Sequence, residues 1–305
     1  MTQEGHRSGF VALAGRPNVG KSTLINAYLG QNVAAVSPRP QTTRLRQLGI
    51  LTLPNAQVIF VDTPGIHKPL HKLGEHMNVV AQEVLEDADL LLVMFDMSQP
   101  PTEDDHRVAE RLEGLSSKPP TLVVLNMIDL VPQDKIQERR VAFESLIPDR
   151  EIHAISSTRG DGREELLNRI LELLPSGPRY YPEDEITDAY ERDIAADLLR
   201  AAALNLLRDE VPHCIAVRID EYKERNEHGA YISATIFVER ESQKGIVIGK
   251  GGGMLREIGT LARKEIEAMS GRKVYLKLRV KVLHGWRNDM KALQRLGLGR
   301  TQQKN

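Results

Sequence analysis

Residues 15–22 read Gly15-Arg16-Pro17-Asn18-Val19-Gly20-Lys21-Ser22, and they connect an apolar run of strand length to a helical pattern. This spacing of glycines, lysine and serine is the phosphate-loop pattern, which is specific in a strand–loop–helix context. The glycines let backbone N–H groups face phosphate oxygens, and the helix adds its positive N-terminal end. We therefore predict a nucleoside triphosphate site, with Lys21 reaching the β- and γ-phosphates and Ser22 ligating Mg²⁺.

The rest of the first half alternates short apolar runs with helical patterns. The strand-length runs are 10–14, 58–61, 90–95, 122–125 and 152–155. Each ends in small or polar residues, as buried parallel strands do, and helical patterns such as 21–29 and 163–174 lie between them. This alternation predicts βαβ units in a doubly wound sheet, whose ligands bind at the carboxyl ends of the strands.

Charge and helix breakers divide the chain in two. Residues 1–239 carry a net charge of −12 and residues 240–300 one of +10, although the whole chain carries −1. Pro175, Gly177, Pro178 and Pro182 interrupt the alternating pattern. We predict an α/β domain at 1–178, a linker at 179–188 and a smaller α+β domain at 189–305. The basic region indicates a surface that binds a polyanion.

Three polar clusters follow strand-length runs, where the sheet would place its ligand. Asp62-Thr63-Pro64-Gly65 closes the second run and offers a carboxylate for Mg²⁺, through water, and a glycine N–H for the γ-phosphate. Asn126-Met127-Ile128-Asp129 follows the fourth run. The Asp129 carboxylate can accept two hydrogen bonds from guanine that adenine cannot donate, so we expect GTP rather than ATP. Ser156-Ser157, after the fifth run, would support the base through a backbone N–H.

A loop before the 58–61 run is the candidate for a nucleotide-sensitive switch. It reads Pro38-Arg39-Pro40-Gln41-Thr42-Thr43-Arg44. A hydroxyl here would complete the Mg²⁺ shell while the γ-phosphate is present, and hydrolysis would release the loop. We favour Thr43 over Thr42 for this role. The predicted Mg²⁺ ligands are therefore Ser22, Thr43 and Asp62.

The basic region holds a second motif of the kind that binds phosphates, Gly249-Lys250-Gly251-Gly252. It matches the GxxG loop of KH domains, which clamps about four nucleotides of a single strand. The surrounding order is helix, strand, strand, helix, loop, helix, strand, at 189–208, 215–219, 231–238, 246–248, the loop, 254–269 and 274–282. We predict RNA contacts at Lys244, Ile246, Ile248, Gly249, Lys250, Gly251, Gly252, Arg256 and Arg263. Tyr275 and Trp286 are either base-stacking or core residues.

Taken together, these motifs resemble the ordered G motifs of Ras-like GTPases. Pro17-Asn18-Val19 and Gln41-Thr42-Thr43-Arg44 are particularly similar to the Era family, bacterial ribosome-assembly GTPases with a C-terminal KH domain. The resemblance runs to about Leu296 and implies a doubly wound P-loop GTPase sheet followed by an α+β type II KH domain. It also implies a GTP-hydrolysing switch that binds the 3′ end of 16S ribosomal RNA and acts in 30S subunit assembly.

The resemblance assigns roles residue by residue. Catalytic roles fall to Lys21, Thr43 and Gly65. GTP contacts fall to Gly15, Arg16, Pro17, Asn18, Val19, Gly20, Lys21, Ser22, Thr23, Asp62, Thr63, Pro64, Gly65, Ile66, Asn126, Met127, Ile128, Asp129, Ser156 and Ser157.

Three positions deserve comparison with the family pattern. Met127 stands where the family usually has a lysine whose stem packs across the base, so base affinity is expected to be lower while Asp129 keeps specificity. Ile66 stands where Ras-type proteins have a water-orienting glutamine, which implies slow intrinsic hydrolysis. Related GTPases hold K⁺ with the residue corresponding to Asn18, so K⁺ is a candidate second cofactor.

Composition limits the alternatives. The single cysteine, Cys214, excludes an internal disulfide and a cysteine-based zinc site. No apolar run approaches the roughly 20 residues of a membrane span, and the amino terminus lacks the apolar stretch of a secretory signal. We expect a cytoplasmic monomer with GTP, GDP, 16S rRNA and the 30S subunit as partners. The resemblance adds peripheral association with the inner face of the cell membrane as an alternative.

Two other functions stay open at this point. The chain could be a passive RNA-binding scaffold whose nucleotide site only stabilises the fold, or a membrane-associated GTPase whose basic face binds anionic lipid. A cluster of His67, His71 and His76 suggests a metal site, but its spacing matches no helix-borne zinc motif. We interpret these histidines as solvated residues of a second switch loop.

Overall fold

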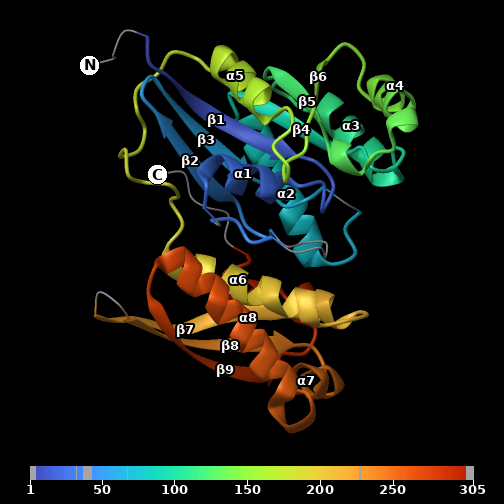
Figure 1. Cartoon of the computed structure of the whole chain (residues 1–305). Helices are drawn as coiled ribbons and strands as arrows, with labels where there is room; N and C mark the ends of the chain where they lie inside the picture. The colour runs from blue at the N-terminus through green and yellow to red at the C-terminus, as the bar shows by residue number, and fades with distance from the viewer. Residues whose placement is uncertain (1–4, 32, 37–42, 67, 227–228, 300–305) are drawn as a thin grey trace. The chain divides into compact units, whose positions relative to one another are not determined.

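The computed structural model describes residues 5–31, 33–36, 43–66, 68–226 and 229–299 (Figure 1). Contacts divide the chain into two units. The first contains Met1–Ala34, Leu45–Lys68 and Met77–Asp188, and the second contains Ala35–Arg44, Pro69–His76 and Ala189–Asn305. The division thus follows the chain order except for two short segments of the first half that group with the second unit.

The first unit is built on a six-stranded sheet of order β2-β3-β1-β4-β5-β6. Its strands are β1 Arg7–Ala14, β2 Gln47–Leu53, β3 Ala56–Asp62, β4 Leu90–Asp96, β5 Thr121–Asn126 and β6 Glu151–Ala154. All neighbours are parallel except β2, which is antiparallel to β3. The carboxyl ends of the five parallel strands therefore lie along one edge, and the predicted nucleotide motifs all follow these ends.

Helices cover both faces of this sheet. They are α1 Lys21–Leu29, α2 Lys72–Glu86, α3 Glu103–Glu113, α4 Ile136–Leu146 and α5 Arg163–Leu173. Alternate residues of β1 divide between the two layers: Ala12 and Ala14 share a core with α2, α3 and α4, whereas Val11 and Leu13 share one with α1 and α5. This is the doubly wound arrangement that strand–helix alternation predicts.

The strand β2 is absent from the strands that the sequence predicts. β2 pairs with β3 as an antiparallel hairpin across Pro54 and Asn55, for example through Ile50 opposite Ile59. Antiparallel neighbours need only a short turn, so no helical pattern separates the two strands and βαβ alternation cannot reveal them. As a result, Asp62 ends the third strand of the chain and not the second.

Residues 180–186 are fastened to the first unit. Gln57 is fully buried on β3, and its Oε1 accepts hydrogen bonds from the backbone N–H groups of Tyr180 and Tyr181 at 2.9 and 3.0 Å. Its Nε2 donates to the Tyr181 carbonyl at 2.9 Å. The backbone N–H of Ile50 on β2, the edge strand, donates to the Ile186 carbonyl at 2.8 Å. The predicted linker therefore covers part of the sheet edge.

The second unit contains a three-stranded sheet of order β7-β8-β9. Its elements are α6 Glu191–Leu206, β7 Ala216–Asn226, β8 Gly229–Val238, α7 Glu241–Ile248, α8 Gly253–Ser270, β9 Lys273–Val282 and α9 Met290–Arg295. β7 and β8 are antiparallel, and β8 and β9 are parallel. α6 and α8 share a core with the even-numbered residues of β8, such as Ile232 and Ile236. The predicted type II KH order of elements is confirmed.

Arg44 is held in the second unit. Arg44 is 4% exposed, its Nη1 donates to the Ile215 carbonyl at 2.9 Å, and its guanidinium lies 5.4 Å from the centre of the Trp286 ring. Trp286 is fully buried and donates from Nε1 to the Cys214 carbonyl at 3.0 Å. Trp286 is therefore a core residue and no platform for a base.

Candidate functional site

The phosphate loop is in contact with the other nucleotide motifs. Gly20 has φ 99°, and a Cβ on it would lie 2.2 Å from the Asn126 side-chain amide. A Cβ on Gly65 would lie 2.7 Å from the backbone nitrogen of Pro17. Both positions exclude any side chain, because real Cβ contacts this short do not occur. The loop therefore depends on glycine at two motifs that are distant in the sequence.

Asn126 joins the phosphate loop to Ser157. Its Nδ2 donates to the Val19 carbonyl at 2.8 Å. Its Oδ1 accepts from the Ser157 backbone N–H at 2.9 Å and from the Ser157 hydroxyl at 3.0 Å. All these groups are buried, so each bond also satisfies a polar atom that water does not reach. The side chain of Asn126 thus positions neighbouring motifs, a role that spacing along the chain does not reveal.

The segment that is predicted to read the base continues directly from Asn126. Met127 is in the left-handed region, with φ 65°, and begins the 3₁₀ turn Ile128–Leu130 that contains Asp129. The Ile128 N–H donates to the Ile155 carbonyl at 3.2 Å, which holds this turn beside Ser156. Asp129 is partly exposed, as a carboxylate that must meet an incoming base should be.

Lys21 is buried, with 6% of its surface exposed. Its Nζ donates to the carbonyls of Gly15 and Arg16, both at 3.1 Å. Burial lowers the pKa of Lys21 to about 8, the negative charge of Asp62 opposes this shift, and the positive charge of Arg16 adds to it. A buried ammonium group that donates to carbonyl oxygens and lies near a carboxylate is well placed to gain from an incoming phosphate.

Two predicted Mg²⁺ ligands lie together. The Ser22 hydroxyl donates to Asp62 Oδ2 at 2.6 Å, and Asp62 is 1% exposed at the end of β3. A hydroxyl and a carboxylate in contact are the hard oxygen donors that Mg²⁺ prefers, so these residues fit the ion. Thr43 groups with the second unit, and its place in the Mg²⁺ shell stays a prediction. Thr42 and residues 38–41 lie outside the described residues.

The segment after β3 is fixed against β1 and the phosphate loop. The Thr63 hydroxyl donates to the Leu13 carbonyl at 2.6 Å, and the Ile66 N–H donates to the Gly15 carbonyl at 3.1 Å. Ile66 is 3% exposed and apolar, so its side chain cannot orient a water molecule for attack. The structure therefore gives a physical basis for the expectation of slow intrinsic hydrolysis.

The side chain of Arg16 pairs with two carboxylates, one at the end of β4 and one in α3. It forms ion pairs with Asp96, from Nη2 at 2.9 Å, and with Asp105, from Nε at 3.1 Å. Asp105 is fully buried and also completes a capping box with Thr102 at the start of α3. The sequence assigned GTP contact to Arg16 without this role; the Thr102 to Asp105 capping spacing is the only local signal for it.

The GxxG loop lies between α7 and α8, with a 3₁₀ turn at Lys250–Gly252. Gly249, Gly251 and Gly252 have φ 72°, 59° and 76°. A Cβ on Gly249 would lie 2.7 Å from that of Met254, whereas one on Gly252 would meet nothing within 4 Å. The loop also forms the N-terminal end of the 18-residue helix α8, where anions are favoured.

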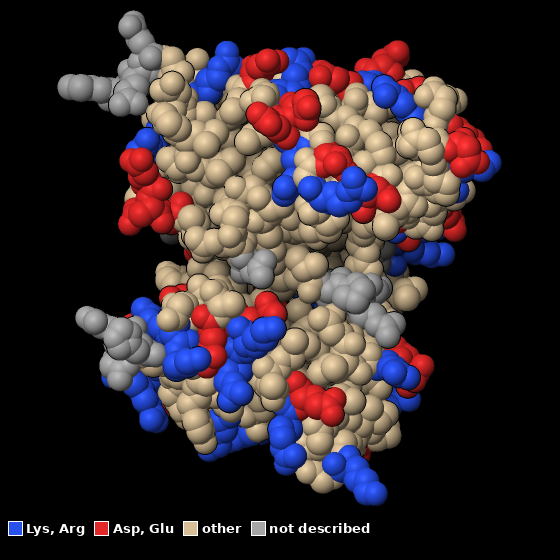
Figure 2. Space-filling view, viewed as in Figure 1, with Lys and Arg blue, Asp and Glu red and all other residues tan. Residues whose placement is uncertain are grey.

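The other predicted RNA contacts surround this loop. Lys250, Arg256 and Arg263 are exposed, and Lys244 pairs with Glu241 at 3.3 Å. Ile246 is 49% exposed, and the neighbouring Val247 is the residue of α7 that enters the core. Figure 2 shows Lys and Arg side chains along the part of the surface that α8 occupies, with a few acidic groups among them. Exposed positive charge therefore lies at the loop, on Lys250, and along α8, on Arg256 and Arg263, whereas Ile248 is only partly exposed.

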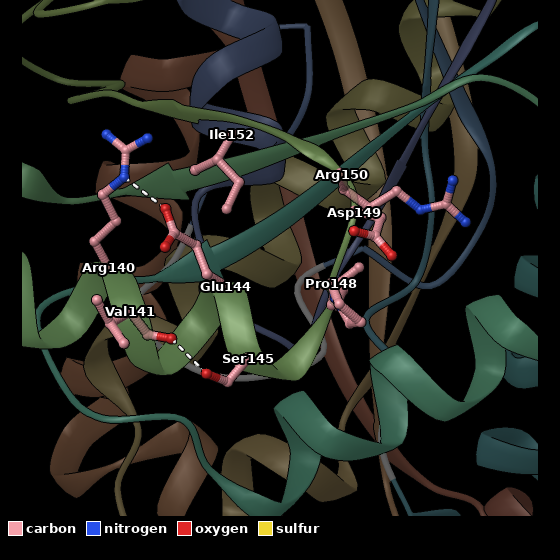
Figure 3. Close-up of a pocket in the computed structure, with 9 residues that line it drawn as sticks. Arg140, Val141, Glu144, Ser145, Pro148, Asp149, Arg150 and Ile152 are labelled. Atoms are coloured by element: carbon pink, nitrogen blue, oxygen red, sulfur yellow. Dashed lines mark hydrogen bonds and ion pairs between the residues drawn. The ribbon is translucent and has the colours of Figure 1, made fainter.

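A hollow of the first unit lies away from these motifs. It has a volume of about 420 Å³ and lies between α4 and the start of β6, where Arg140, Glu144, Asp149 and Arg150 line it (Figure 3). Arg140 and Glu144 pair with each other at 2.8 Å. Since it adjoins the amino end of β6, it is at the edge of the sheet opposite to the nucleotide motifs.

Two negative findings concern metals and membranes. Within the ranges that the structure describes, no three His, Cys, Asp or Glu side chains gather as a metal site would require, and His67 lies outside those ranges. No helix of the described chain is both long enough and apolar enough to cross a bilayer.

Comparison with known proteins supports both motif groups. A family model described as 50S ribosome-binding GTPase matches residues 10–127, and a KH domain model matches residues 210–287. GTPase Era of Thermotoga maritima is 49% identical over 294 residues, which are 96% of this chain and 97% of that protein. GTPase Era of Geobacter metallireducens is 44% identical over 298 residues, 97% of this chain and 99% of that protein.

Two crystal structures extend the likeness to the fold of nearly the whole chain. One is Era in complex with MgGDPNP and nucleotides 1506–1542 of 16S ribosomal RNA, with a TM-score of 0.90 at 40% identity over 97% of this chain and 100% of that one. The other is a variant of Aquifex aeolicus Era bound to GDP and AlF4⁻, with a TM-score of 0.89 at 40% identity over 96% and 100%.

Proposed function

The chain belongs to the Era family of GTPases, and from this premise we propose that it is a GTP-hydrolysing switch that binds the 3′ end of 16S ribosomal RNA during assembly of the 30S subunit. The observation that carries this proposal is the presence of two phosphate-binding loops in one chain, Gly15–Ser22 in the first unit and Gly249–Gly252 in the second. The scaffold and lipid alternatives explain only one of the two loops.

Hydrolysis in this proposal depends on positioning and on charge stabilisation. Lys21 and the N–H groups of the phosphate loop and Gly65 would stabilise the charge on the transferring phosphoryl group. Ser22, Thr43 and Asp62 would hold Mg²⁺, which would supply positive charge at the same place. The contact between Ser22 and Asp62 and the burial of Lys21 support these roles.

Asn18 is the proposed ligand of K⁺. It is exposed in the phosphate loop with φ 66°, so its side chain is on the accessible side of the loop. A monovalent cation there would add positive charge beside the phosphates where Ile66 offers no catalytic side chain. We expect hydrolysis to be faster in K⁺ than in Na⁺ at equal ionic strength, and Asn18→Ala to remove the difference. Equal rates in the two salts for the wild-type protein would refute this assignment.

The RNA-binding role is assigned to the GxxG loop and the basic surface around it. Coupling to GTP is proposed to run through the switch loop, because Thr43 directly precedes Arg44, which is seated in the second unit. Release of Thr43 after hydrolysis would then alter a segment that belongs to the RNA-binding unit.

Calorimetry tests the proposal directly. We expect the purified chain to bind GTP and GDP in the presence of Mg²⁺, and to bind an RNA that carries the 3′ end of 16S rRNA. Failure to bind either nucleotide would overturn the switch. Phosphate release that stays absent even with 30S particles would favour the passive scaffold.

Four narrower assignments are proposed on the same basis. They are a cytoplasmic location, a monomeric state, peripheral contact with the inner membrane face, and domain limits of 1–178, 179–188 and 189–305, with residues 180–186 of the linker fastened to the first domain. Light scattering tests the monomer. Flotation with anionic liposomes, compared with RNA binding at the same salt concentration, tests the membrane contact.

A further inference from the structure

The sheet of the second unit has a second face, away from α6 and α8, and it is strongly basic. Every odd-numbered residue of β9 on this face is exposed: Lys273, Tyr275, Lys277, Arg279 and Lys281. β7 adds Arg218, Lys223 and Arg225 to the same face. Arg218 lies opposite Thr235 of β8 and Lys223 opposite Tyr231, and the Arg225 guanidinium lies over the Tyr231 ring. We call these eight residues the outer sheet face.

The charge of this face is largely unbalanced. Two acidic residues of β7 lie beside it: Asp220 pairs with Arg218 at 2.7 Å, and Glu221 pairs with Lys223. Lys273 reaches Glu267 of α8 at 3.4 Å. Among the residues that the structure describes, neither Lys277 nor Arg279 takes part in an ion pair. A row of cations at alternate positions of an exposed strand attracts a polyanion.

An exposed aromatic ring stands within this row. Tyr275 is 66% exposed, although it is stacked on Tyr231 at 5.7 Å with an interplanar angle of 13°. The Arg225 guanidinium lies 5.3 Å from the centre of the Tyr231 ring and supports the pair from the β7 side. A fixed ring with an open edge and face between lysines is the arrangement on which an unpaired base stacks.

We propose that the outer sheet face binds single-stranded RNA that extends beyond the nucleotides held by the GxxG loop. The proposal rests on the RNA-binding function proposed above. Phe237 pairs with Lys281, and β8 leads directly into α7, so the Lys281 end of β9 is the end nearest the loop. From Lys273 to Lys281 the strand spans about 26 Å, enough for roughly seven stacked nucleotides.

Other occupants fit this face less well. Amphipathic binding to lipid needs several protruding apolar groups, and Tyr275 is the only large hydrophobic side chain that the described part of the outer sheet face exposes. Protein interfaces are depleted of lysine at their centres, where this face has Lys277. A base-paired helix would not offer a free base to Tyr275.

The test compares two RNAs. The core RNA is the last dozen or so nucleotides of 16S rRNA, and the extended RNA carries about ten added uridines at the 5′ or 3′ end, since stacking platforms accept any base. The wild-type protein should bind an extended RNA about 10-fold more tightly or better. The variant Tyr275→Ala/Lys277→Gln/Arg279→Gln should keep the affinity for the core RNA and lose this gain. For the extended RNA, the slope of log affinity against log salt concentration should be smaller in magnitude by about 1.4 in the variant, because two fewer phosphates are neutralised.

Matched variants separate stacking from general effects. Tyr275→Phe should keep the gain and Tyr275→Leu should lose most of it, because only the ring stacks. Lys118→Gln/Lys135→Gln removes two exposed charges from the first unit and should leave the gain intact. Thermal melting checks that each variant is folded.

The remaining outcomes decide the matter. A gain that survives in the triple variant would overturn the proposal, as would a gain seen only with a hairpin extension. If the triple variant binds the extended RNA as tightly as the wild type does but no longer binds anionic vesicles, the face is a lipid-binding surface. If the wild-type protein ignores the core RNA, the GxxG assignment fails, and oligouridylate of about sixteen nucleotides then tests the outer sheet face alone.

Discussion

The two glycine loops of this protein use the same backbone chemistry in opposite settings. Each precedes the N-terminal end of a helix and contains residues with positive φ. In the first unit the loop is enclosed: Asn126 contacts Gly20, and Gly65 contacts Pro17. In the second unit a Cβ on Gly251 or Gly252 would meet nothing within 4 Å. An enclosed loop suits a small ligand that is surrounded on all sides, and an open one suits a polymer that passes across it.

The largest effect should come from placing a methyl group in the enclosed loop. In Gly20→Ala the new Cβ would collide with Asn126 at 2.2 Å, and φ 99° would be strained as well. We expect GTP affinity, measured by calorimetry, to fall by a factor on the order of 10² to 10³, because the strained backbone adds to the roughly 10²-fold cost of a 1 Å displacement in such a site. The affinity for RNA should not change.

Gly30→Ala is the matched control for this variant. Gly30 ends α1 with φ 67°, and a Cβ there has no neighbour within 4 Å. It should cost only about 1 kcal/mol of stability and leave GTP binding intact. Equal losses of GTP affinity in the two variants would contradict the view that Asn126 encloses the loop.

Asp129→Asn should have the next largest effect, because Asp129 is the residue predicted to read the base. An amide cannot accept both hydrogen bonds from guanine, so GTP affinity should fall about 100-fold or more. Inosine triphosphate lacks the 2-amino group of guanine, so the difference in affinity between the two nucleotides measures the hydrogen bond from that group. Wild-type protein should prefer GTP to inosine triphosphate in competition assays, and the variant should bind both alike. A preference that persists in the variant would remove Asp129 from the site.

Gly252→Asp addresses the open loop. It adds one negative charge where the RNA backbone is proposed to pass, so RNA affinity should fall about 10-fold at low salt, and less at high salt. GTP binding should stay unchanged. Gly252→Ala, which meets no neighbour, should cost RNA binding little. Unchanged RNA affinity in Gly252→Asp would contradict the assignment of the GxxG loop.

The smallest effect concerns the buried charge in the enclosed loop. The pKa of Lys21 is about 8 in the folded protein against an ordinary 10.5, so between these values the unfolded chain binds the extra proton and stability rises with pH. Lys21→Met removes this gain. In nucleotide-free protein, the free energy of unfolding of the wild type should therefore rise relative to that of Lys21→Met, by about 1 kcal/mol per pH unit above pH 8. Urea unfolding at pH 7, 8 and 9 measures it.

The sequence predicted those parts of the molecule whose chemistry is local. The phosphate loop, the segment at Asp62 and the GxxG loop are short patterns, and the α/β fold, the KH module and the family are confirmed. The individual site residues stay predictions. The order of the nucleotide motifs along the chain was enough to predict that they lie together, because the strand ends of a parallel sheet meet at one edge.

What the sequence did not reveal depends on contacts between distant residues. Nothing near Asn126 indicates that it holds Val19 and Ser157, and nothing near Arg16 indicates Asp96 as its partner. β2 was missed because its partner is the next strand and no helix intervenes. The seat of Arg44 against Trp286 joins residues 242 positions apart, beyond the reach of any local pattern.

The fastening of residues 180–186 has a practical consequence for dissecting the protein. A fragment cut at residue 178 would lose the Ile186 carbonyl that Ile50 binds and the backbone partners of Gln57. The buried Gln57 side chain would lack its hydrogen-bond partners, and the backbone of the edge strand β2 would be exposed. An exposed edge strand can pair with a second copy of the fragment, so the truncated domain would tend to self-associate. An isolated GTP-binding fragment should therefore be cloned to residue 188.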